Sequence, residues 1–117
     1  MSNDNNILIS YDDPLRGYSR EGLIKELQRR LAGRVQKAYV YGSFLTQEFS
    51  PGSDIDLILI KDTVSNFFER YKEFHDLRTF NPSIEYLVYT PEEWHRLTSE
   101  PSIGFWESLV STMQRIV

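Results

Sequence analysis

Apolar positions near the start of the chain recur with the period of an α-helix. One face of such a helix carries Leu23, Ile24, Leu27 and Leu31. Ser19 is a residue type that caps helix N-termini, and Gly33 suits a helix C-terminus, so the pattern predicts a helix between them. The apolar residues 35–41 then predict a strand.

Two further runs predict strands. Residues 55–60 follow the turn signal Pro51-Gly52-Ser53 and form an apolar run typical of a strand covered on both faces. Residues 83–89 are rich in aromatic and branched side chains, which favour strands. Between the first two strands, the short polar stretch after Gly42-Ser43 is compatible with a helical turn.

The remaining pattern predicts helices. A stripe at helical spacing, ended by Asn81-Pro82, contains Val64, Phe67, Phe68, Tyr71, Phe74 and Leu77. The run Thr90-Pro91-Glu92-Glu93 supplies a cap, a proline at the first helical position and a glutamate at the third, which indicates a helix start. We expect Pro101 to end that helix. A last amphipathic helix is predicted from Phe105, Trp106, Leu109, Val110 and Met113.

The alternation of helices and strands indicates an α/β fold in which helices flank a small mixed β-sheet. About a dozen residues join the first two strands, too few for a helical crossover, so these strands are expected to be antiparallel. The third strand follows a long helix, which favours a right-handed crossover and a parallel pair. This order places Gly42, Ser43 and Asp54 at one edge of the sheet, with Glu85 alongside.

Composition narrows the class of protein. A length of 117 residues without repeats or linkers predicts one domain, 1–117, in which the polar residues 1–6 are expected to be disordered. The sequence has no cysteine and no stretch of about 20 apolar residues, so we expect a cytoplasmic protein without a membrane span. A formal net charge of −4 argues against direct nucleic-acid binding, because phosphate contacts need a basic surface.

Two aspartates open the second predicted strand. Asp54 and Asp56 are two positions apart, so both side chains project from one face with their Cα atoms about 6.6 Å apart. Ionised carboxylates at that separation repel each other unless a cation lies between them, and oxygen ligands favour Mg²⁺. Most Asp-x-Asp pairs at a strand start are ordinary edge or turn residues. Gly42-Ser43 and Glu85 at the same edge are what favour a site.

The spacing of Gly42-Ser43, ten residues, and Asp54-Ile55-Asp56 resembles the signature of polymerase-beta-like nucleotidyltransferases, in particular the minimal nucleotidyltransferase group. The resemblance extends from about Ser19 to the C-terminus, through the strand that bears Glu85. It implies the polymerase-beta-like nucleotidyltransferase fold. It also implies transfer of a nucleoside monophosphate from a nucleoside triphosphate, with ATP as the expected donor, to an acceptor hydroxyl. Many members are antitoxins encoded with a small helical ribonuclease toxin of the HEPN type, which implies such a partner.

Carried onto this chain, the resemblance implies that Asp54 and Asp56 ligate two Mg²⁺ ions and that Glu85 is the third carboxylate. One ion would hold the triphosphate, and the other would activate the acceptor hydroxyl, whose proton Glu85 would receive. Glycine in the Gly-Ser pair lets the backbone approach phosphate, and the serine offers its hydroxyl and amide. The implied nucleotide-binding residues are Gly42, Ser43 and Ser53.

Several assignments have competitors. Glu85 is the one charge in an apolar strand and a charge there needs a partner, but Glu73, Asp76 or Glu48 could take its role. His95 falls in a helical pattern without a nucleophile beside it, and we expect no catalytic role for it.

One feature departs from the family pattern. Many antitoxin members carry an arginine a few residues after the Gly-Ser pair, whereas residues 44–47 are Phe-Leu-Thr-Gln. Lys61, Arg29 or Arg30 could supply the missing cation, although each is also a typical surface residue.

Three functions fit the residues. The first is a Mg²⁺-dependent enzyme that adenylylates a protein acceptor, most simply a tyrosine of a partner toxin. The second is a nucleotidyltransferase that acts on a small molecule, similar to the aminoglycoside-modifying enzymes. The third is a non-catalytic module that neutralises a toxin by binding it.

Overall fold

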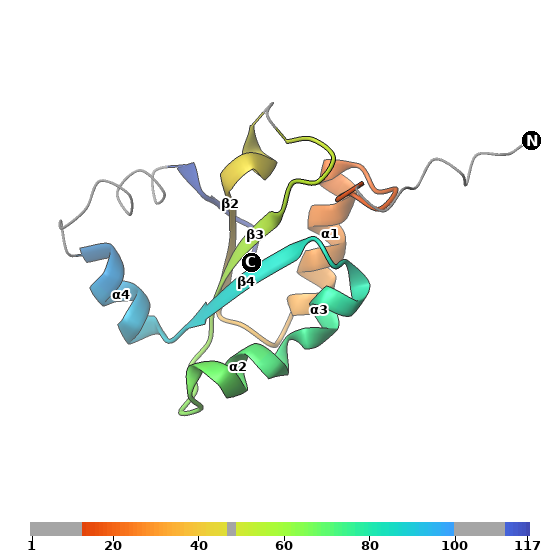
Figure 1. Cartoon of the computed structure of the whole chain (residues 1–117). Helices are drawn as coiled ribbons and strands as arrows, with labels where there is room; N and C mark the ends of the chain where they lie inside the picture. Colours follow the sequence, from red (N-terminus) through yellow and green to blue (C-terminus); the bar gives the residue numbers. More distant parts are fainter. Residues whose placement is uncertain (1–12, 47–48, 100–111) are drawn as a thin grey trace, which may run out of the picture.

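The computed structural model describes residues 13–46, 49–99 and 112–117, and a mixed sheet crosses its centre in the order β4-β3-β2-β5 (Figure 1). The described strands are β2 (Lys37–Tyr41), β3 (Ile55–Ile60), β4 (Ile84–Tyr89) and β5 (Gln114–Arg115). The described helices are α1 (Arg20–Leu31), the 3-10 helix η2 (Gly42–Leu45), α2 (Phe67–Glu73), α3 (His75–Phe80) and α4 (Pro91–Ser99). This arrangement confirms the predicted mixed α/β fold.

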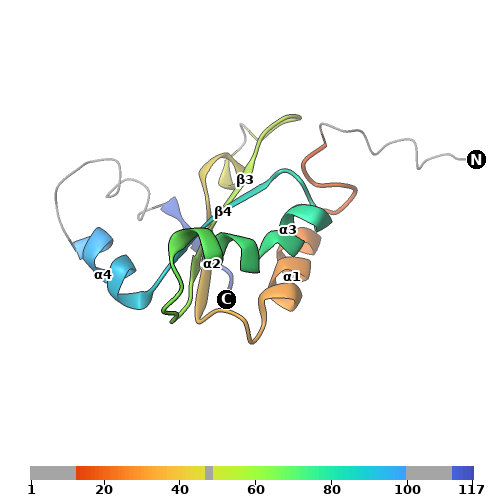
Figure 2. The same ribbon diagram turned by 60° about the horizontal axis from the view of Figure 1, so that its bottom comes forward.

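Different helices cover the two faces of the sheet (Figures 1 and 2). On one face, buried strand residues form a core with the apolar side chains of α1 and α3. Its members include Leu23, Leu27, Leu31, Val40, Leu57, Leu59, Leu77, Tyr86 and Val88. On the other face, the ring of Trp94 in α4 stacks on Tyr39 and Tyr89, with centroid distances of 5.8 and 5.9 Å. The central strand β3 is therefore covered on both sides, as predicted.

Strand pairing follows the predicted topology. β2 and β3 are antiparallel, with Tyr41 opposite Asp56. β3 and β4 are parallel, with Asp56 opposite Glu85. The short link between β2 and β3 and the helical link between β3 and β4 account for these two directions.

Helix α1 begins and ends where the sequence predicts. Ser19 is the N-cap, and its hydroxyl oxygen accepts a hydrogen bond from the amide of Gly22 at 2.9 Å. Past the other end, Gly33 has a φ of +77°, the left-handed conformation that commonly follows a helix. The buried face is Leu23, Leu27 and Leu31, as the apolar period indicates.

The helical stripe between β3 and β4 was predicted only in part. Asn66 caps α2, since its side-chain oxygen accepts the amide of Glu69 at 2.9 Å, and Val64 therefore lies outside the helix. The helix is interrupted at Phe74, where φ is −108° and ψ is 17°, and α3 begins at the next residue. Phe74 is buried, whereas Phe68 is 67% exposed. The prediction of one continuous helix with these residues on a single stripe is therefore wrong.

Helix α4 starts with the predicted capping box. The Glu93 amide donates to the Thr90 hydroxyl at 3.1 Å, and the Thr90 amide donates to Oε1 of Glu93 at 2.8 Å. The same carboxylate binds the guanidinium group of Arg70 in α2 at 2.7 Å. Glu93 thus links the start of α4 to α2.

Strand β5 is an element that the pattern did not predict. It pairs antiparallel with β2, and the buried Ile116 follows it. Its two residues, Gln114 and Arg115, are polar and exposed, so they carry no apolar signal. Met113 precedes this strand and is not helical, in contrast to the prediction that it belongs to the last helix.

Some predictions fall on other parts of the chain. The expected disorder of residues 1–6, the break at Pro101 and the rest of the last helix lie outside the described residues. Among the helices that are described, none has the length and hydrophobicity needed to cross a membrane.

Candidate active site at the edge of the sheet

The turn after β2 brings the backbone of Gly42 against the side chain of Asp56. Gly42 has a φ of +80°, a conformation that residues with side chains rarely adopt. A Cβ atom at this position would also lie 3.0 Å from Oδ2 of Asp56, closer than ordinary van der Waals contact. Both the backbone angle and the lack of space explain why glycine stands at the start of η2.

A second tight turn leads into β3. The amide of Ser53 donates to the carbonyl oxygen of Ser50 at 3.0 Å, and the amide of Ser50 donates to the Ser53 hydroxyl at 3.2 Å. This turn ends at Asp54 and so sets the direction in which the chain enters the strand. Ser53 is one of the residues predicted to bind nucleotide, and its hydroxyl group thus already accepts a hydrogen bond within this turn.

Three polar side chains form a row across neighbouring strands. Tyr41 in β2, Asp56 in β3 and Glu85 in β4 are in register. Residues paired in this way project from the same face of a sheet, which here is the face opposite the main core. Asp54 lies two residues before Asp56, at the predicted edge. The fold therefore places Asp56 and Glu85 on one face of neighbouring strands, with Asp54 just before the strand that carries Asp56.

The carboxylates affect one another electrostatically. Burial raises the pKa of Asp56, and the negative charges of Asp54 and Glu85 raise that pKa further. Burial also raises the pKa of Tyr41 to about 12, with the charge of Asp56 as the next cause. Ionised Asp56 is therefore stabilised by any cation at this edge, while the Tyr41 hydroxyl keeps its proton at neutral pH.

Asp54 and Asp56 have the ligand chemistry of a hard divalent cation, but the expected group of three carboxylates is not assembled in the described structure. Asp54 and Asp56 provide carboxylate oxygens, the ligands that Mg²⁺ prefers. Within the residues that the structure describes, no three histidine, cysteine, aspartate or glutamate side chains are close enough together to hold a metal ion. Glu85 lies next to the aspartate pair in the sheet, but its Oε2 is 3.5 Å from Nη1 of Arg78.

Comparison with known proteins decides the family. Residues 4–97 match the family described as Polymerase beta, Nucleotidyltransferase. The chain belongs to this nucleotidyltransferase family. The chain is also similar to a crystal structure from Sulfolobus solfataricus described as that of "a putative nucleotidyltransferase". Their identity is 23%, the match covers 66% of this chain and 68% of that chain, and the TM-score is 0.44. No curated protein matches.

Arg78 is a positively charged residue near the candidate site that the sequence did not predict. Arg78 in α3 donates to the Tyr71 hydroxyl at 3.2 Å and to the Pro82 carbonyl oxygen at 3.1 Å, and its Nη1 is the atom that approaches Glu85. The sequence contains no signal for this pair, because the return of the chain from α3 into β4 is what brings the two residues together.

The competing carboxylates are paired elsewhere. Glu73 forms an ion pair with Lys61. Asp76 binds the guanidinium group of Arg34 at 2.9 Å. Glu48 lies outside the described residues. Glu85 is also paired, with Arg78, but it is in register with Asp56, which makes it the better placed of the described candidates.

The cations considered as substitutes for the missing arginine also have other partners. Lys61 follows β3, at the end opposite Asp54, and pairs with Glu73. Arg29 and Arg30 both bind Glu26 on α1. None of these three ion pairs involves a carboxylate of the candidate site.

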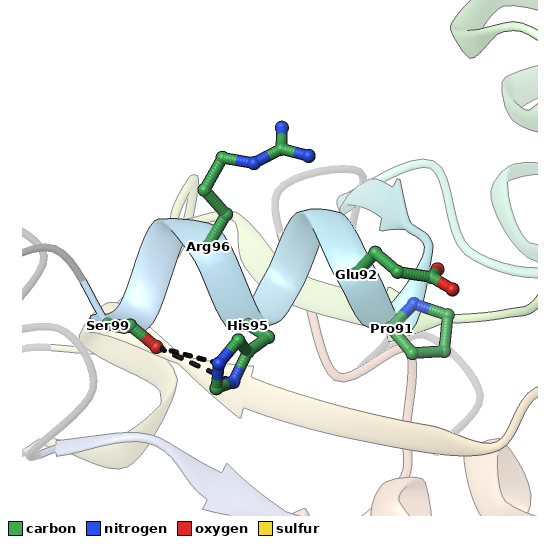
Figure 3. Close-up of a pocket in the computed structure, with 5 residues that line it drawn as sticks. All are labelled: Pro91, Glu92, His95, Arg96 and Ser99. Atoms are coloured by element: carbon green, nitrogen blue, oxygen red, sulfur yellow. Dashed lines mark hydrogen bonds between the residues drawn. The ribbon is translucent and has the colours of Figure 1, made fainter.

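A pocket on α4 is separate from this row of side chains. Its described lining residues are Pro91, Glu92, His95, Arg96 and Ser99 (Figure 3). The Ser99 hydroxyl lies 3.4 and 3.5 Å from the two ring nitrogens of His95. All five residues come from one helix, whereas the candidate active site is built from η2, β3 and β4, so this pocket does not extend the site.

We expect Asp56→Asn to change the pH dependence of stability in EDTA. Because the folded-state pKa of Asp56 is raised above its ordinary value of 3.8, the wild-type protein loses stability as the pH rises through that raised pKa. The variant lacks this loss. The free energy of unfolding of wild type minus that of the variant should therefore fall from pH 3.5 toward neutral pH. Urea denaturation at several pH values measures this difference, and a constant difference contradicts the expectation.

Proposed function

We propose that this protein is a Mg²⁺-dependent nucleotidyltransferase of the minimal nucleotidyltransferase group. It transfers AMP from ATP to a hydroxyl of a partner protein and acts as the antitoxin of a small helical HEPN-type toxin. One observation carries the proposal. In a chain of this family, Asp56 is in register with Glu85 and touches the turn that begins at Gly42, with Asp54 two residues away.

The described side chains suggest a division of roles. Asp54 and Asp56 would hold the metal ions, with Glu85 as the third carboxylate. When bound, the ions supply positive charge for the triphosphate and lower the pKa of the acceptor hydroxyl. Gly42 would let the turn lie directly against Asp56, and Ser43 is half-buried beside it with a hydroxyl that can donate to phosphate. Glu85 accepts the proton of the attacking hydroxyl at its carboxylate.

The acceptor in this proposal is a partner protein and not a small molecule. Leu87 lies two residues beyond Glu85 on the same face of β4, and its side chain is 42% exposed. The partner would contact Leu87 when it presents its hydroxyl group to the carboxylates.

A non-catalytic module is the second candidate. The observation that favours it is the ion pair between Glu85 and Arg78, which engages the carboxylate proposed to accept a proton. Such a module would bind and neutralise the toxin without turnover. It shares the fold and the partner with the proposed enzyme but requires no ATP.

Label transfer distinguishes these functions. The protein is isolated from its own organism together with the proteins that co-purify with it and incubated with Mg²⁺ and ATP labelled at the α-phosphate. We expect label on the partner protein, none when the label is on the γ-phosphate, and none in EDTA, because pyrophosphate leaves and the metal is required. Suppression of toxicity without any label transfer supports the module. Label on an added aminoglycoside instead of the protein supports the small-molecule enzyme.

A further inference from the structure

A guanidinium group from α1 holds the end of the 3-10 helix that carries Gly42 and Ser43. Arg20 donates from Nη1 to the carbonyl oxygen of Phe44 at 2.9 Å and from Nη2 to that of Thr46 at 3.1 Å. Its Cζ also lies 5.7 Å from the ring centroid of Phe44. These contacts join the first residue of α1 to the end of η2, with the rest of α1 and all of β2 between them in the sequence.

The positive charge of Arg20 stabilises the end of η2 and does not stabilise the start of its own helix, α1. Arg20 is the first residue of α1, where the helix dipole disfavours positive charge. The carbonyl groups that it binds are at the end of η2, where helical carbonyls lack partners and a cation is favourable. A planar guanidinium group can donate to two oxygens at once in a fixed geometry, which an ammonium group does not do.

The segment that Arg20 holds is in direct contact with the candidate site. The carbonyl oxygen of Ser43 accepts the amide of Thr46 at 2.9 Å and its hydroxyl at 3.0 Å, so the turn is a compact unit. The first residue of this unit, Gly42, lies against the carboxylate of Asp56. A shift of the carbonyl end of η2 therefore also moves Gly42 and Ser43 relative to Asp56.

We infer that Arg20 is a positioning residue that holds the Gly42-Ser43 turn in the conformation that binds the triphosphate. The inference rests on the proposed function. Arg20 acts through the carbonyl oxygens of Phe44 and Thr46 and not by contact with substrate. Residues 44–47 contain no arginine, so the guanidinium group that binds this turn comes from α1.

Two substitutions and a matched control test this role. Arg20→Gln removes the positive charge and the pair of guanidinium donors, whereas Arg20→Lys keeps only the charge. The control Arg29→Gln makes the same change at an arginine of α1 that pairs with Glu26. We expect Arg20→Gln to raise the KM for ATP about tenfold with kcat within about threefold of wild type, since ordering of the binding turn is lost. Arg20→Lys should fall between, and Arg29→Gln should match wild type.

Amide hydrogen exchange provides a readout that is independent of activity. In Arg20→Gln the amides of residues 43–46 should exchange faster, while those in the middle of α1 should not. Unchanged exchange in residues 43–46 overturns the inference, and so does a normal KM in a variant with a lower melting temperature. A wild-type protein that neither transfers nor binds nucleotide refutes the proposed function. The exchange rates then still decide whether Arg20 orders the turn.

Discussion

Replacing Asp56 with asparagine is expected to abolish nucleotidyl transfer and to leave the fold intact. Asparagine keeps the size of the side chain but removes the central negative charge that faces Asp54 and Glu85. A metal site contributes several kcal/mol to the transition state, so the rate should fall by a factor of about a thousand or more. The measurement is the initial rate of label transfer from ATP at saturating Mg²⁺.

The same variant should be at least as stable as wild type in EDTA. Burial and two neighbouring charges oppose ionisation of Asp56, so removal of its charge relieves repulsion in the metal-free protein. Asp62→Asn is a matched control, because Asp62 is exposed and lies beyond the other end of β3. Transfer by Asp56→Asn within tenfold of wild type contradicts the proposed role. A comparable loss in Asp62→Asn shows that the effect is not specific to the site.

Truncation of Glu93 is expected to cause a large loss of stability. Arg70 is only 7% exposed, and its guanidinium group forms two hydrogen bonds with Glu93, at 2.7 and 3.2 Å. Glu93→Ala leaves a buried cation without its anion and removes the capping box of α4. The free energy of unfolding should fall by about 3–5 kcal/mol, as urea denaturation can measure.

Glu92→Ala is the matched control, since Glu92 is the neighbouring carboxylate in the first turn of the same helix. Its loss should be small, and equal losses for the two variants contradict the proposed importance of the pair. The hydrogen bond from Arg70 lowers the pKa of Glu93 below its ordinary value of 4.5. The difference between wild type and Glu93→Ala should therefore hold at pH values above 4.5 and shrink as the pH falls further.

Local signals predicted the ends of several elements well. The caps Ser19 and Thr90 begin α1 and α4, and residues 55–60 form β3 with the predicted bounds. Each of these signals depends on side chains that bond the backbone within three or four residues, or on a short apolar run. Such interactions do not require knowledge of the rest of the fold.

The pattern failed where tertiary packing selects among equivalent choices. Phe68 satisfies the apolar period as well as Phe74 does, but the sheet buries Phe74 and leaves Phe68 exposed. Strand β5 forms because residues next to it bond β2 at Ala38, and its own residues are polar. Neither outcome can be found from spacing along the chain, because both depend on which surface is available.

Connection lengths and side-chain alternation predicted which strands carry the candidate residues, although the expected group of three carboxylates is not assembled among the described residues. They put Asp54 and Asp56 beside the Gly42-Ser43 turn and Glu85 on the neighbouring strand, and the strand register agrees. The roles of these residues in metal and nucleotide binding remain predictions.

By itself, the sequence determined the order and directions of β2, β3 and β4, the starts of α1 and α4, and the strands that carry Asp56 and Glu85. Only the tertiary structure decided the partners of two arginines, Arg78 beside the carboxylate of Glu85 and Arg20 at the carbonyl end of η2. The physical reason is that long, flexible cationic side chains bind whatever carbonyl or carboxylate the fold brings within reach. Their partners are therefore set by the packing of α1 and α3 against the sheet.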